Sequence, residues 1–87
     1  AEYGLPSLHP NPFNSRLTVT LPLDRAADVR VRVFNLRGVP VTTLHSGRLE
    51  AGRHQFIWTA AGLPAGTYIL KVDRGMQEAV ERAVLLP

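Results

Sequence analysis

The chain has 87 residues, a formal net charge of +3 at pH 7 and no cysteine, so it can form one domain but no disulfide or thiolate metal site. No apolar run approaches the ~20 residues that a membrane-spanning helix needs, and no signal peptide is visible, as in a mature or excised domain. Nine of the ten basic residues are arginine; they are spread from Arg16 to Arg82 instead of forming one stripe, so the charge does not indicate a nucleic-acid partner.

Residues 1–15 are predicted to be a linker and entry segment, followed by one domain over residues 16–87. The segment holds three of the seven prolines, and a residue that precedes proline is pushed toward an extended conformation. Near its end it contains the run PNPFN, in which prolines disfavour strand pairing and asparagines can cap turns. The residues of this entry motif are Pro10, Asn11, Pro12, Phe13 and Asn14. We expect Phe13 to close one end of the domain.

The rest of the chain predicts six short strands, over residues 16–21, 28–35, 39–44, 52–59, 66–73 and 76–86. The second is the clearest, because Val29, Val31 and Val33 alternate with Arg30 and Arg32, and successive side chains of a strand point to opposite faces. Turns are expected at 36–38, 46–47, 60–65 and 74–75, each of which contains glycine or proline.

Other strands repeat this alternation and give the expected core face. Its members are Leu17, Val19, Leu21, His54, Phe56, Trp58, Tyr68, Leu70 and Val72. In the last strand, Val80, Val84 and Leu86 would face one way, and Glu81, Ala83 and Leu85 the other. Six to seven short antiparallel strands with glycine and proline turns predict an all-β, immunoglobulin-like β-sandwich.

No residues have the spacing of a catalytic or metal site. The histidines His9, His45 and His54 fit no zinc-ligand pattern, the carboxylates do not pair across an evident cleft, and no serine lies in a GxSxG context. We therefore expect no catalytic residue, metal or cofactor. An exposed Trp58 would suit sugar stacking, so a carbohydrate-binding module and a plain structural module of a secreted enzyme are alternatives, although its strand neighbour Phe56 favours a core position.

Five short motifs follow one another along the chain. They are PNPFN at 10–14, the segment Phe34–Gly38 with Val41, Ala51-Gly52 with His54 and Trp58, Gly66-Thr67-Tyr68, and Val84-Leu85-Leu86. In this order they resemble the C-terminal sorting domain of proteins exported by the type IX (Por) secretion system, over about residues 5–86. The immunoglobulin-like module of flagellar hook-capping proteins shares part of the pattern.

The resemblance implies that the domain is an address label on a larger cargo protein. The implied partners are an N-terminal cargo domain, the outer-membrane type IX translocon and a sortase-like peptidase that removes the label before surface attachment. The implied location is the periplasm in transit, then the cell surface or the medium. The residues expected to carry the sorting signal are Gly66, Tyr68, Ala83, Val84, Leu85 and Leu86. Family members commonly end with basic residues, whereas this sequence stops at Pro87.

Overall fold

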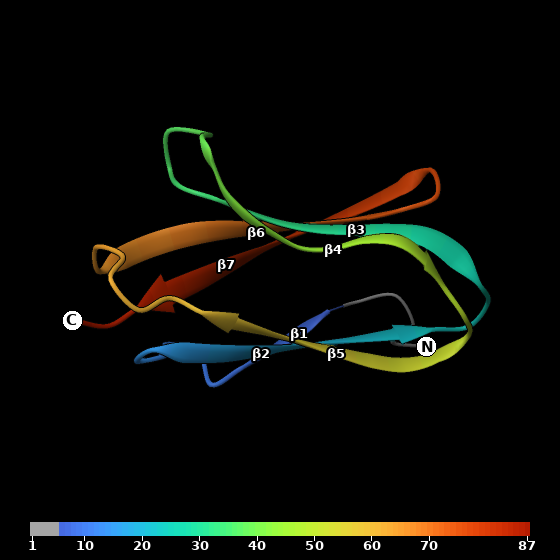
Figure 1. Cartoon of the computed structure of the whole chain (residues 1–87), viewed down its shortest axis with the longest axis horizontal. Coiled ribbons are helices and arrows are strands. Elements are labelled where there is room, and N and C mark those ends of the chain that lie inside the picture. The colour runs from blue at the N-terminus through green and yellow to red at the C-terminus, as the bar shows by residue number, and fades with distance from the viewer. Residues whose placement is uncertain (1–5) are drawn as a thin grey trace.

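The computed structural model describes residues 6–87, which form seven β-strands and no helix (Figure 1). The strands are β1 (Ser7–His9), β2 (Arg16–Leu23), β3 (Ala27–Phe34), β4 (Pro40–Leu49), β5 (Gly52–Thr59), β6 (Gly66–Arg74) and β7 (Gln77–Leu85). A three-stranded sheet has the order β1-β2-β5 and a four-stranded sheet the order β4-β3-β6-β7, and all strand pairs are antiparallel. The two sheets stack face to face, which confirms the predicted all-β, immunoglobulin-like sandwich.

The core lies between the sheets and is built from alternate residues of the central strands. Leu17, Val19 and Leu21 of β2 are fully buried, as are Val31 and Val33 of β3. The core-facing residues of β6 are also buried, and no polar or charged side chain among residues 6–87 is. The period of two in the sequence therefore identified the core face correctly, because the pleat of a strand sends successive side chains to opposite sides.

Two predicted turns lie elsewhere in the structure. Ser46 and Gly47 do not turn the chain but pair with Arg30 and Val29 inside β4. This strand is an edge strand with two register shifts against β3, and such bulges disturb the regular alternation by which a strand is recognised. The chain instead leaves β4 after Leu49 and passes to the other sheet.

The hairpin between β6 and β7 turns at residues 75–76, one position later than expected. Arg74 pairs with Gln77, so the loop has two residues, and its first residue, Gly75, has a φ of 58°. Positive φ at the first loop position is the requirement of a two-residue hairpin turn that glycine meets without strain.

The segment before β2 takes part in both sheets. Ser7–His9 form β1 and pair with β2, after which the chain reaches the four-stranded sheet, where Phe13 forms a parallel bridge with Leu85. Residues 1–5 of the predicted linker lie outside the described residues. The division into a 1–15 segment and a 16–87 domain stays a prediction, although residues 7–15 contribute hydrogen bonds and core contacts to the sandwich.

Candidate functional site

An aromatic cluster joins three of the sequence motifs at one end of the core. The rings of Phe13 and Trp58 are 5.2 Å apart between centroids, and Tyr68 meets Trp58 edge-on at 5.3 Å. Their exposed fractions are 1%, 3% and 5%. Phe13 thus occupies the position expected of it, and the burial of Trp58 removes the exposed aromatic platform that a sugar-binding module would need.

Tyr68 also closes the loop that precedes its own strand. Its hydroxyl donates a 2.6 Å hydrogen bond to the carbonyl oxygen of Pro64, an arrangement known in immunoglobulin-like sandwiches as a tyrosine corner. Gly66 lies between them with a φ of 144°, a conformation that favours glycine. The motif Gly66-Thr67-Tyr68 is therefore a device that fixes the β5–β6 loop against the core.

Asn35 closes the β3–β4 turn, a role that the sequence analysis missed. Its side-chain oxygen accepts hydrogen bonds from the backbone N–H groups of Arg37, at 2.9 Å, and Val39, at 3.0 Å. The backbone N–H of Gly38 donates to the Asn35 carbonyl at 3.0 Å, and Gly38 has a φ of 82°. Asparagine is the usual residue for such side-chain-to-backbone turns, so its position just before Leu36-Arg37-Gly38 was the available signal.

At the opposite end of the sandwich, His54 secures the passage from β4 to β5. Its Nε2 donates a 2.7 Å hydrogen bond to the carbonyl oxygen of Glu50, across Ala51-Gly52. His54 is partly buried, as expected for a strand residue. Among residues 6–87, no three histidine, cysteine or acidic side chains come close enough to hold a metal ion.

The entry motif binds along the free edge of β7. Phe13 donates its N–H to the Val84 carbonyl oxygen and accepts from the N–H of Leu86, both at 2.8 Å. The side chain of Asn11 accepts from the N–H of Val84 at 3.0 Å and donates to the Arg82 carbonyl oxygen at 2.8 Å. Because Pro10 and Pro12 lack an N–H, the Asn11 amide takes the place of a backbone peptide group in this pairing.

These hydrogen bonds of Asn11 and Phe13 to β7, the β7 clamp, limit which backbone groups of the last strand are free to pair with a partner. β7 is an edge strand, and edge strands present unpaired backbone groups that can accept another strand. From the carbonyl of Arg82 to the N–H of Leu86, however, the backbone groups that point away from β6 are bonded to Asn11 and Phe13. Strand addition over this half of β7 would require displacement of the entry motif.

The residues expected to carry the sorting signal divide into buried and exposed sets. Tyr68, Ala83 and Leu85 are buried, with exposed fractions of 5%, 1% and 4%. Val84 is half-buried, and Leu86 and Gly66 are exposed. The alternation expected for the last strand is therefore present, with Ala83 and Leu85 anchoring it and Val84 and Leu86 facing outward.

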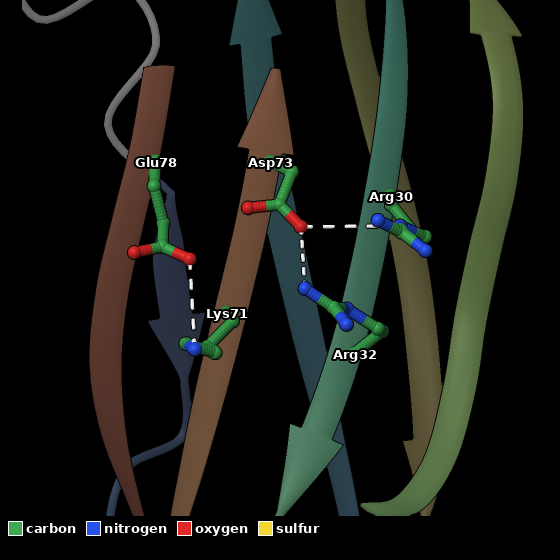
Figure 2. Close-up of polar contacts among 5 residues, drawn as sticks. All are labelled: Arg30, Arg32, Lys71, Asp73 and Glu78. Atoms are coloured by element: carbon green, nitrogen blue, oxygen red, sulfur yellow. Dashed lines mark hydrogen bonds and ion pairs between the residues drawn. The ribbon is translucent and has the colours of Figure 1, made fainter. Parts of the chain in front are cut away.

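The outer face of the four-stranded sheet carries a small network of charges (Figure 2). Arg32 on β3 donates a 2.6 Å hydrogen bond to Asp73 on β6, and Arg30 lies 3.9 Å from the same carboxylate oxygen. Lys71 and Glu78 approach to 3.6 Å. Lys71 and Glu78 are the more exposed pair, so their interaction contributes little to stability. The side chains of Arg32 and Asp73 are only 26% and 25% exposed, but none of these pairs forms an acid–base pair inside a cleft.

The comparison with protein families gives a match over nearly the whole chain. The family model for the secretion system C-terminal sorting domain matches residues 7–85. The chain belongs to this family. The match confirms the resemblance drawn from the motifs and identifies the chain as a type IX sorting domain, a class exported to the cell surface or beyond. No curated protein matches the chain, and no helix among the described residues is long and apolar enough to span a bilayer.

Proposed function

We propose that this sorting domain directs a cargo protein, attached on its N-terminal side, from the periplasm through the outer-membrane type IX translocon. The supporting observation is the family match over residues 7–85. The folded state is part of the proposal, because the family motifs build the aromatic cluster, the turns and the β7 clamp. The translocon would therefore read a folded surface and not a linear peptide.

The direction of β1 is compatible with a cargo attached on the N-terminal side of the domain. β1 pairs antiparallel with β2, so it runs toward the end of the sandwich at which β2 begins. That end also carries the β3–β4 turn, the β5–β6 loop and the end of β7 (Figure 1). A cargo that precedes β1 would therefore lie toward the opposite end of the sandwich. It would leave accessible the end that carries the β3–β4 turn, the β5–β6 loop and the end of β7.

We further propose that a sortase-like peptidase releases the label by cutting before β1, after which the cargo is attached to the surface. A peptidase needs an extended, accessible backbone, and such backbone is scarce in the domain itself. From Ser7 to His9 the chain is paired in a sheet, and from Asn11 to Ser15 it is hydrogen-bonded to β7 and to Ala60. The cut would therefore fall on the N-terminal side of Ser7, and the hydrogen-bonded residues from Ser7 to Ser15 would stay with the domain.

The test is export of a periplasmic reporter in a bacterium that carries the type IX system. A reporter fused to residues 1–87 should reach the surface or the medium, and the unfused reporter should stay in the periplasm. The Trp58→Ala fusion, whose core is disrupted, should also be retained if a folded label is read. Equal export of fused and unfused reporter would leave the structural-module alternative as the better account.

A further inference from the structure

Among the large apolar side chains of the five sequence motifs, Leu36 is the one that is mostly exposed to solvent. It lies in the β3–β4 turn with an exposed fraction of 70%, and it does not pack against the core cluster. The turn itself is closed by Asn35 and Gly38, so a polar residue at position 36 would serve the hairpin equally well. Folding alone gives no reason for a leucine here.

Leu36 does line a hollow between two motif-bearing loops. The hollow has a volume of about 360 Å³ and is lined by residues 35–37, Val41 and residues 63–68. Leu63, Pro64 and the ring of Tyr68 supply apolar wall, and the tyrosine hydroxyl holds Pro64 in place. The volume suits a binding site for one or two apolar side chains with a few polar contacts.

The charge around the hollow is positive. Among residues 6–87, Arg37 is the only charged residue that lines the hollow, and the ion pairs of the same residues involve only Asp73 and Glu78 as acids. Five of the six described carboxylates lie toward the opposite end of the sandwich, where β2, β4 and β6 end and β3 and β7 begin; they are Asp24, Asp28, Glu50, Asp73 and Glu78. A partner segment with a carboxylate would be attracted to this end and oriented by Arg37.

We propose that this hollow is the docking site for the translocon, and that its occupant is an extended translocon segment with an apolar side chain beside a carboxylate. The apolar side chain enters between Leu36 and Leu63, and the carboxylate pairs with Arg37. This inference rests on the proposed sorting function and deepens it. It also explains how a receptor can bind although the entry motif already covers the edge of β7 from Arg82 to Leu86.

The variants Leu36→Ser and Arg37→Glu test the two halves of the site in the reporter fusion. Each should lower export about tenfold or more, as expected when a central apolar anchor or a charge partner is lost. The matched controls are Ile57→Ser, which alters a 58% exposed side chain on the three-stranded sheet, and Arg53→Glu near the opposite end. The controls should be exported like the intact domain, and all four purified variants should keep its melting temperature.

A binding measurement supplies a readout that is independent of export. The probe is the synthetic peptide acetyl-Glu-Leu-Glu-Leu-Glu-amide, titrated into the purified domain and followed by amide NMR shifts. Signals of Leu36, Arg37 and Thr67 should move, and the corresponding peptide with lysine in place of glutamate should leave them unchanged. Identical shifts with both peptides would contradict the charge-selective site.

The outcomes separate this inference from the function on which it rests. If the intact fusion stays in the periplasm, the sorting function fails. If the intact fusion, Leu36→Ser and Arg37→Glu are all exported equally, the sorting function stands and the docking site is wrong. A concentration-dependent dimer of the purified domain that Leu36→Ser abolishes would assign the hollow to a second copy of the chain, which also overturns the proposal.

Discussion

Replacement of Asn11 by alanine should weaken the attachment of the entry motif to the last strand without disturbing the core. The variant loses two hydrogen bonds, one from the Val84 N–H at 3.0 Å and one to the Arg82 carbonyl at 2.8 Å. A hydrogen bond contributes about 0.5–1.5 kcal/mol net, and because both lie at the surface, where water replaces them, we expect a total loss of about 1–2 kcal/mol. For a domain of this size that loss lowers the melting temperature by roughly 4–8 °C per kcal/mol.

Urea unfolding measures this loss, and amide hydrogen exchange of Val84 locates it. Asn11→Asp should exchange more slowly at Val84 than Asn11→Ala, because a carboxylate oxygen still accepts from that N–H while the donor to Arg82 is gone. Asn14→Ala is the matched control, since Asn14 is an exposed neighbour in the same motif with no side-chain hydrogen bond to residues 6–87. If Asn11→Ala has the stability of the wild type and the same rate of amide exchange at Val84, the proposed role of the β7 clamp is wrong.

Two further substitutions test the aromatic cluster by denaturant unfolding. Trp58→Ala removes the ring between Phe13 and Tyr68 and should cost about 3–5 kcal/mol, close to the full stability of a small domain; a modest shift in midpoint would show that the ring is not central to the core. Tyr68→Phe keeps the ring contact with Trp58 but leaves the Pro64 carbonyl without its 2.6 Å partner, so it should cost about 1–3 kcal/mol, and unchanged stability would contradict the tyrosine corner.

The features that the sequence predicted are those that depend on neighbours along the chain. The core face of β3 followed from the alternation of Val29, Val31 and Val33. The range of β5, residues 52–59, was predicted correctly from the alternation of His54, Phe56 and Trp58. Phe13 was also placed correctly at one end of the core. For the two strands a local rule of backbone geometry was sufficient.

The features that the sequence did not reveal depend on contacts between distant segments. The hydrogen bonds of Asn11 join residues that are 71 and 73 positions apart, and no local pattern marks a side-chain amide that completes an edge strand. The continuation of β4 through Ser46-Gly47 likewise depends on its pairing with β3. The hollow exists only because the β3–β4 turn and the β5–β6 loop meet in space.

The final strand shows why any loss of export in this domain must be read together with stability. Deleting residues 83–87 would remove Ala83 and Leu85 from the core and take away Val84 and Leu86, which bond to Asn11 and Phe13. The domain would therefore lose export by unfolding even if the receptor binds elsewhere. Leu86→Ser alters only a 44% exposed side chain and keeps the backbone bond to Phe13. If Leu36→Ser abolishes export and Leu86→Ser does not, recognition lies at the hollow; the reverse result returns it to the last strand, as the sequence motifs suggested.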